Sequence, residues 1–198
     1  LLPPNNAKIL PDEAVRSLKI AGQHNRANAT LVIEACKLLN IATEDQVCSA
    51  INDFPGTDRR FEKLANNLYS DYGHHPTEIK ATLQMASELS NQVVLVYQPH
   101  QNVRQHEIRS QYTDDIFTSA SKIYWLPTYL TREDPSLPVL KPQELTSQLS
   151  YPEKIHYAEL DDNLWQNIHS ELKNGKLVLC MGAGTIDGWL RNQLKSNS

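Results

Sequence analysis

The sequence has few cysteines, no long apolar run and little excess charge, and each scarcity excludes a class of protein. Its three cysteines, Cys36, Cys48 and Cys180, are far apart and set among apolar residues, which favours buried reduced thiols over a disulfide framework or a zinc site. No apolar run approaches the roughly 20 residues of a membrane span. A net charge of −4 disfavours nucleic acid and anionic membranes as partners. We therefore expect a soluble, cytoplasmic protein.

The length and the first residues of the chain limit its organisation. A chain of 198 residues can hold one large domain, or one domain and part of another. The opening stretch LLPPNNAKIL lacks the charged start and long apolar core of a signal peptide.

Two helices are predicted before a break in the pattern. Apolar residues recur at helical spacing over residues 25–39. Thr43 and Gln46 then form the pattern of a capping box, which predicts a second helix from residue 44 to about Phe54. Pro55 and Gly56 mark a turn, so we expect a domain boundary between about residues 55 and 60.

Short apolar runs alternate with helical patterns in the rest of the chain. Residues 61–72 are expected to be irregular or short strand structure. The runs QVVLVYQ, KIYWLPT, KIHYA and KLVLCMG predict strands, and helices are expected over residues 76–89, 104–119, 143–149, 161–172 and after the last strand. Such alternation predicts an α/β fold over residues 71–198, a doubly wound and mostly parallel sheet that binds ligands at the carboxyl ends of its strands.

Several polar residues follow strands or turns. His100 and Arg104 come just after a predicted strand, where a ligand would bind, although on this stretch alone a solvated loop and helix start is the favoured explanation. Arg59 and Arg60 stand beside the Pro-Gly turn and could clamp a phosphate or carboxylate, or form an ordinary surface pair.

The stretch GQHNRANA carries an imidazole, His24, and two carboxamides, Asn25 and Asn28, on one helical face. Carboxamides can recognise an adenine edge, but asparagine near a helix start is commonly a cap.

The stretch SDYGHHPTEIKATL places two histidines before a proline. Adjacent His74 and His75 point in different directions and lack a nearby partner ligand, which disfavours a metal site. Pro76 fits the first turn of a helix. A helix entrance accounts for Pro76 but not for Asp71, Tyr72 and His74.

The segment GAGTIDGWL after the last strand invites a dinucleotide-binding interpretation. The third glycine of that fingerprint is replaced by Asp187, and Gly188 falls one residue late, so the fingerprint fails. A tight strand-to-helix turn remains, either purely structural or with amides that face a ligand.

Taken together, GQHNRANA, FPGTDRRFE, SDYGHHPTEIKATL, YQPHQNVR, YLTREDP and MGAGTI occur in the order and approximate spacing of one family. The sequence resembles the Mur ligases from about residue 19 to residue 194. Within that family it looks most like the enzymes that join L-alanine to UDP-N-acetylmuramate in peptidoglycan synthesis.

The resemblance implies an ADP-forming amide ligase that uses ATP and Mg²⁺ to phosphorylate a carboxylate, which an amine then attacks. It also implies three domains, but the P-loop pattern G-x-x-x-x-G-K-[ST] is absent from this sequence. The chain is therefore interpreted as a fragment: residues 1–56 end the central ATPase domain, and residues 57–198 form the carboxyl-terminal domain. Alone it is expected to be inactive. Its expected partners are UDP-N-acetylmuramate, L-alanine and the rest of its own chain.

The resemblance also implies roles for individual residues. No catalytic or metal-binding residue is expected in this fragment, and Gly73 is expected to supply a permissive backbone. The residues expected near ATP are His24, Asn25, Asn28, Arg60 and Asp71. The residues expected near the amino-acid and muramoyl substrate are Tyr72, His74, His100 and Arg104.

Two alternatives remain open. Ser70 and Gln101 depart from the family pattern and weaken the L-alanine assignment, whereas Tyr72 and Gly73 favour it over a related ligase that recycles a murein tripeptide. A Mur-like domain kept as a non-catalytic binding module is the second alternative, and a full-length gene without a P-loop would identify it.

Overall fold

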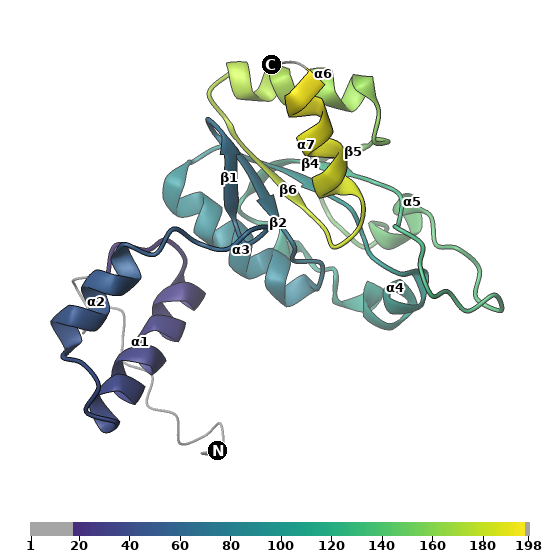
Figure 1. Ribbon diagram of the computed structural model, residues 1–198. Helices are drawn as coiled ribbons and strands as arrows, with labels where there is room; N and C mark the ends of the chain where they lie inside the picture. The colour runs from purple at the N-terminus through teal and green to yellow at the C-terminus, as the bar shows by residue number, and fades with distance from the viewer. Residues whose placement is uncertain (1–17, 197–198) are drawn as a thin grey trace. The chain divides into compact units, whose positions relative to one another are not determined.

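The computed structural model describes residues 18–196 and divides into two compact units, Leu1–Pro55 and Gly56–Ser198 (Figure 1). We call these the first unit and the second unit. The opening stretch LLPPNNAKIL lies outside the described residues. Among the described residues, no helix is long and apolar enough to cross a membrane.

The first unit contains two helices, α1 (Gln23–Leu38) and α2 (Glu44–Asn52). The predicted capping box is confirmed, because the Gln46 amide N–H donates to Thr43 Oγ1 at 3.4 Å and the Thr43 amide N–H donates to Gln46 Oε1 at 2.9 Å. The helix α2 ends at Asn52, two residues before the predicted end. A small core of Ile33, Val47 and Cys48 lies between the helices.

The second unit is built on a six-stranded sheet with the order β1-β2-β6-β3-β4-β5. Neighbouring strands are parallel except for β1, which pairs antiparallel with β2. This confirms the prediction of an α/β fold with a mostly parallel sheet, although the sheet begins at Glu62, upstream of residue 71. The strands are β1 (Glu62–Ala65), β2 (Leu68–Asp71), β3 (Val93–Tyr97), β4 (Ala120–Trp125), β5 (Ile155–Tyr157) and β6 (Leu177–Met181).

Helices and 3₁₀ turns connect these strands, largely where the sequence predicts them. They are α3 (Pro76–Leu89), α4 (Asn102–Ile108), η3 (Arg109–Gln111), η4 (Asp114–Ile116), α5 (Pro142–Leu145), η5 (Pro152–Lys154), α6 (Asp162–Lys173) and α7 (Ile186–Ser196). The helix predicted over residues 143–149 is shortened to the four residues of α5.

The helix predicted over residues 104–119 is wrong beyond Ile108. The chain continues there as two 3₁₀ turns, although Tyr112, Ile116 and Phe117 are buried at spacings that resemble a helix. Between them, Thr113 Oγ1 donates to Asp115 Oδ1 at 2.5 Å, and Asp114 Oδ1 accepts from the Ser150 amide at 2.9 Å. Short polar side chains that bond the local backbone or each other compete with regular helix, so burial is achieved here without a continuous helix.

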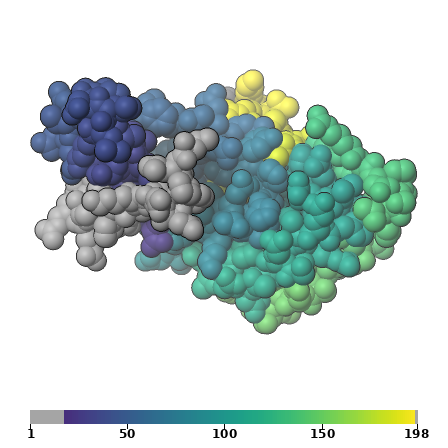
Figure 2. All heavy atoms as spheres, turned by 90° about the horizontal axis from the view of Figure 1, so that it is seen from below, coloured from purple at the N-terminus to yellow at the C-terminus, as the bar shows by residue number. Residues whose placement is uncertain are grey.

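Alternation along the strands divides the core into two layers. In β3, Val93, Leu95 and Tyr97 face the layer covered by α3, α4 and α5, while Val94 and Val96 face α6 and α7. Figure 2 shows the side covered by α3 and the segments after it, where blue-teal to green atoms form a close-packed surface. Because the sheet is parallel, the chain segments after β2, β3, β4 and β6 all leave from the same edge. We call this the carboxyl edge.

Candidate functional site at the carboxyl edge of the sheet

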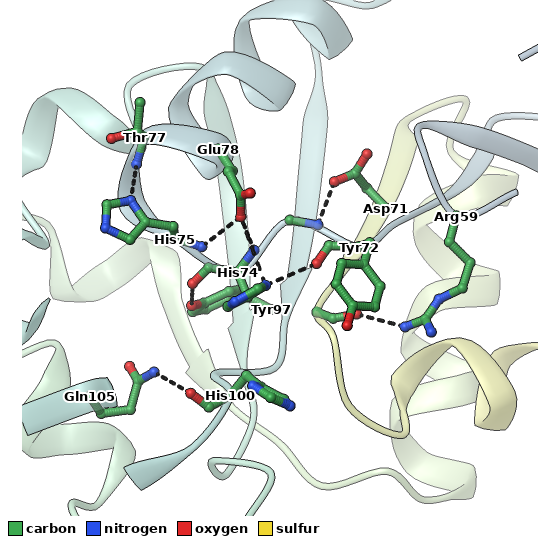
Figure 3. Close-up of polar contacts among 12 residues, drawn as sticks. Arg59, Asp71, Tyr72, His74, His75, Thr77, Glu78, Tyr97, His100 and Gln105 are labelled. Carbon is green, nitrogen blue, oxygen red and sulfur yellow. Dashed lines mark hydrogen bonds and ion pairs between the residues drawn. The ribbon is translucent and has the colours of Figure 1, made fainter. Parts of the chain in front are cut away.

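A row of four rings crosses the carboxyl edge. Tyr72 and His74 follow β2, His100 follows β3, and Tyr129 follows β4. The ring centroids of Tyr72 and His74 are 5.8 Å apart, those of His74 and His100 are 5.3 Å apart, and those of His100 and Tyr129 are 5.6 Å apart. We call these four residues the edge row. Figure 3 shows Tyr72 and His74 on the segment after β2 and His100 on the segment after β3.

Two arginines continue the edge row beyond Tyr72. The Arg59 and Arg60 guanidinium carbons lie 4.7 Å and 5.4 Å from the centroid of the Tyr72 ring, within the range of cation–π attraction. The Arg59 side chain is committed elsewhere, because it donates to the Gly182 carbonyl oxygen at 3.1 Å. The exposed Arg60 side chain has no hydrogen bond or ion pair to any described residue, which leaves its fork of donors available to a ligand.

The backbone around Arg60 is unusual. Arg59 has φ +56° and Phe61 has φ +50°, a region that L-residues seldom adopt. Non-glycine residues in this region carry strain and cluster at functional sites, so the turn that presents Arg60 is a candidate ligand contact on geometric grounds.

The Asp71 carboxylate is tied to the main chain. Oδ1 accepts from the Gly73 amide at 2.7 Å and Oδ2 accepts from the Phe61 amide at 2.8 Å, and the residue is only 7% exposed. Burial raises the pKa of this carboxyl group, although both amide donors act to lower it. In the described structure Asp71 therefore fastens β2 to the turn that carries Arg60, and its contact with ATP stays a prediction.

Gly73 is required for a reason other than the predicted permissive backbone. It is not among the residues with positive φ. A Cβ atom added at this position would lie 2.8 Å from both Asp71 Oδ1 and Met181 Cε. The absence of a side chain thus lets the chain pass close to Asp71 and to the end of β6.

The two adjacent histidines have different tasks. His75 is the N-cap of α3, where its Nδ1 accepts from the Thr77 amide at 3.3 Å and Pro76 occupies the first turn, which confirms the predicted helix entrance (Figure 3). The His74 ring joins the edge row, with Nδ1 3.2 Å from the Tyr72 carbonyl oxygen.

Glu78 connects the two histidines. Its Oε2 accepts from the His74 amide at 2.9 Å and from the His75 amide at 3.0 Å. Burial alone would raise the pKa of this carboxyl group, but the two amide donors and the nearby His74 and Arg60 outweigh it and lower the pKa. The described residues include no group of three or more His, Cys, Asp or Glu side chains that could hold a metal ion.

His100 and Arg104 are separated in the structure. The His100 ring is stacked on Tyr129, and burial together with the neighbouring His74 lowers the pKa of His100. Arg104 lies on α4, is exposed and forms an ion pair with Glu107 at 2.7 Å. The edge row thus includes His100, whereas no contact of Arg104 with the edge row is found.

The predicted nucleotide residues of the first unit stay untested. His24, Asn25 and Asn28 lie on α1, and Asn25 Nδ2 donates to the Ala21 carbonyl oxygen at 3.0 Å. The N-cap of α1 is Gly22, so Asn25 is not the cap itself.

The glycine-rich turn after β6 packs on a residue that sequence reasoning missed. Gln98 Oε1 accepts from the Ile186 amide at 3.0 Å, and Gln98 Nε2 donates to Thr185 Oγ1 at 3.2 Å. A Cβ atom at Gly182 would lie 2.7 Å from the Gln98 carbonyl oxygen, and one at Gly184 would lie 2.6 Å from Gln98 Oε1. Close packing on Gln98 explains Gly182, and close packing on both Gln98 and Tyr129, whose Cβ and Cγ would also lie 2.6 Å away, explains Gly184. These contacts support the structural interpretation of this turn.

Sequence reasoning also missed the contacts between the segment after β4 and the start of α4. Tyr129 itself is held beside His100 by main-chain bonds, since its amide donates to the Pro99 carbonyl oxygen at 2.8 Å and its carbonyl oxygen accepts from the Gln101 amide at 2.9 Å. Glu133 accepts from the amides of Asn102 and Val103 at 3.0 Å and 3.1 Å. The buried Asn102 side chain in turn donates to the Pro138 carbonyl oxygen and accepts from the Leu140 amide. The motif YLTREDP, which contains Tyr129 and Glu133, was the available signal.

Two hollows lie away from the edge row. One of about 720 Å³ lies between α6 and α7 and is lined by Trp165, His169 and their neighbours. Another of about 510 Å³ lies beside β5 and is lined by residues that include Lys122 and Asn167. Neither includes a residue of the edge row.

A family model and several known proteins match this chain. The model described as Mur ligase, glutamate ligase domain, matches residues 59–184. A UDP-N-acetylmuramate–L-alanine ligase from Jannaschia sp. is 30% identical over 179 residues, which cover 87% of this chain and 37% of the relative. The ligase of the same name from Bdellovibrio bacteriovorus is 33% identical over 179 residues, which cover 87% of this chain and 38% of the relative. The chain thus spans less than two fifths of these relatives.

Solved structures share the fold. A UDP-N-acetylmuramate–alanine ligase from Thermotoga maritima aligns with a TM-score of 0.62 at 24% identity, covering 91% of this chain and 40% of that protein. A murein peptide ligase from Psychrobacter arcticus aligns with a TM-score of 0.54 at 24% identity, covering 90% of this chain and 38% of that protein.

Proposed function

Because this chain belongs to the Mur ligase family, we propose that it is the carboxyl-terminal part of an ATP-dependent, ADP-forming ligase that joins L-alanine to UDP-N-acetylmuramate in the cytoplasm. The observation that carries this proposal is the similarity of 30% or more over 87% of the chain to ligases of that name. Residues 1–56 would then end the central ATPase domain, and residues 57–198 would form the carboxyl-terminal domain.

The carboxyl edge offers suitable groups for such substrates. The exposed Arg60 fork matches two oxygens of a phosphate or carboxylate. His74 and His100, with ring centroids 5.3 Å apart, add ring nitrogens that can donate or accept hydrogen bonds. ATP would supply the phosphoryl group that activates the carboxylate for attack by the amine. Mg²⁺ would be held mainly by the part of the ligase outside this chain, since the described residues offer no cluster of metal ligands.

The edge row alone is an incomplete site. Its four residues are half-buried, and neither described hollow includes them. Excluding water from a phosphoryl transfer and stabilising its charge require a phosphate cradle and a metal, and the sequence has no P-loop pattern. We therefore expect the isolated chain to be inactive and the site to be completed by the rest of the ligase.

The test is an assay of the full-length protein that contains this chain. The proposal expects ADP release that requires both UDP-N-acetylmuramate and L-alanine, and no turnover from the 198-residue chain alone. ADP release with a murein tripeptide in place of L-alanine would instead assign the recycling ligase. A full-length gene without a P-loop and without ADP release would identify a non-catalytic binding module.

A further inference from the structure

A buried hydrogen-bond chain joins the two histidines of the edge row through their main chains. Tyr97 Oη lies 2.8 Å from the His74 carbonyl oxygen and 2.9 Å from Tyr112 Oη. Tyr112 Oη lies 2.7 Å from Gln105 Oε1, and Gln105 Nε2 donates to the His100 carbonyl oxygen at 2.9 Å. Figure 3 shows the two ends, where Tyr97 reaches His74 and Gln105 reaches His100.

All three connecting side chains are sealed inside the second unit. Tyr97, Tyr112 and Gln105 are each 0% exposed. The Trp125 ring packs edge-on against both tyrosine rings, with centroids 5.0 Å and 5.2 Å away. Burial raises the pKa of both tyrosines, so each keeps its phenolic hydrogen at neutral pH. Water cannot replace a link of this chain without opening the core.

The hydrogen-bond chain has fewer hydrogens than contacts to fill, so the orientation of one hydroxyl group affects the other. The chain has three oxygen–oxygen contacts, from His74 to Tyr97, from Tyr97 to Tyr112 and from Tyr112 to Gln105. Only the two phenolic hydrogens can fill them, because the His74 carbonyl oxygen and Gln105 Oε1 at the two ends carry no hydrogen and can only accept. One contact therefore lacks a hydrogen at any moment, and the orientation of one hydroxyl restricts that of the other.

We propose that Tyr97, Tyr112 and Gln105 are positioning residues that couple the His74 and His100 loops, so that the two imidazoles respond to a disturbance together. The coupling itself is independent of the proposed function. Only the further step, that the coupling serves ligand binding, rests on the proposed function. Among the described residues, the side-chain hydrogen bonds that lead from Tyr112 and Gln105 toward the edge row run through Tyr97 and end on the main-chain carbonyl oxygens of His74 and His100, not on an imidazole ring.

The experiment follows the histidine side chains of the 198-residue chain by ¹⁵N nuclear magnetic resonance during a pH titration without ligand. Tyr112→Phe keeps the ring and removes one hydroxyl, and Gln105→Met keeps the length and removes both amide links. Tyr124→Phe is the matched control, because its hydroxyl lies 3.3 Å from Glu171 Oε1 in the other core layer.

In both test variants we expect the His74 and His100 imidazole signals to shift and the titration midpoint of His100 to rise toward the ordinary histidine value. The control should leave both histidines unchanged, and thermal melts establish which variants fold. A shift at one histidine only, or a shift no larger than in the control, would overturn the coupling. Loss of folding in both test variants beside a folded control would also overturn it, in favour of a purely structural role.

The outcome is independent of the proposed function. Failure of the full-length protein to release ADP would contradict the proposed reaction and leave the coupling intact. If the full-length protein releases ADP normally but the two histidines respond independently, the coupling is contradicted and the proposed reaction stands.

Discussion

The two units differ in how much apolar surface they cover. The first unit has a core cluster of Ile33, Val47 and Cys48, whereas the second has two large clusters, one on each face of its sheet. Of the ten exposed large hydrophobic residues that the structure describes, six lie in the first unit. They are Leu31, Val32, Leu38, Leu39, Ile41 and Phe54. The first unit thus leaves a larger share of its apolar side chains exposed than the second unit does.

The difference shows that a sequence can specify helices correctly without supplying enough packed layers for a stable domain. The helices α1 and α2 form where the sequence predicts them, with a capping box at Thr43. Two short helices nevertheless lack the packed layers that stabilise a domain. We infer that the second unit is stable by itself and that the first unit needs further packing partners to be stable.

The most direct way to break this comparison is to separate the units. A protein comprising residues 56–198 should fold cooperatively, while residues 1–55 alone should not. In the whole chain, amides of the central strands β3 and β6 should exchange hydrogen with solvent most slowly, and those of α1 and α2 should exchange orders of magnitude faster. Hydrogen exchange followed by mass spectrometry measures this. Equal protection in both units would contradict the inferred difference.

A substitution at Asp71 sharpens the comparison within the second unit. Asp71→Asn should lower the free energy of unfolding by about 1–3 kcal/mol. Both carboxylate oxygens of Asp71 accept a hydrogen bond from a main-chain amide, whereas the asparagine side chain has one oxygen and one NH₂ group, so one of the two amides would lose its acceptor. Urea unfolding measures the effect, and Asp115→Asn is the matched control because Asp115 forms an exposed pair with Lys80. Equal effects at the two positions would mean that the buried Asp71 contacts contribute little.

The smallest expected effect concerns Glu78 and pH. The pKa of Glu78 is lower in the folded state than its ordinary value of 4.5, so its contribution to stability is present above pH 4.5 and is lost as pH falls through the folded pKa. Glu78→Gln should remove that part of the acid dependence. Urea midpoints measured from neutral pH downward test it, with the exposed Glu153→Gln as control. An unchanged acid profile in Glu78→Gln would refute the role of the two amide donors.

The periodic parts of the fold could be predicted from sequence. The strands β3 and β6 are continuous apolar runs, and α3 begins at Pro76 as its sequence indicates. The region after Ile108 could not be predicted, because Tyr112, Ile116 and Phe117 imitate helical spacing while local polar contacts interrupt the helix. Periodicity reports which residues are buried, and it cannot report which backbone conformation buries them.

The candidate site was predicted in part for a similar reason. A predicted strand end indicated His100, because the carboxyl ends of parallel strands meet at one edge, whereas His74 was expected at the site only from the resemblance. Gln98 and Asn102 were missed, since a buried polar residue has the same sequence signal as one in a loop. The commitment of both Asp71 oxygens to main-chain amides depends on tertiary contacts that no local pattern contains.

The central claim is that the carboxyl edge binds substrates of a ligase completed by the rest of its chain. Steady-state kinetics of the full-length protein with Arg60→Ala tests it most directly. Loss of one charged hydrogen bond, about 1.5–3 kcal/mol, should lower kcat/KM for ATP by about tenfold to a hundredfold. Arg109→Ala, at an exposed arginine on η3, and His75→Ala, at the N-cap of α3, should leave it nearly unchanged. Normal ATP kinetics in Arg60→Ala, or a larger loss in either control, would contradict the account.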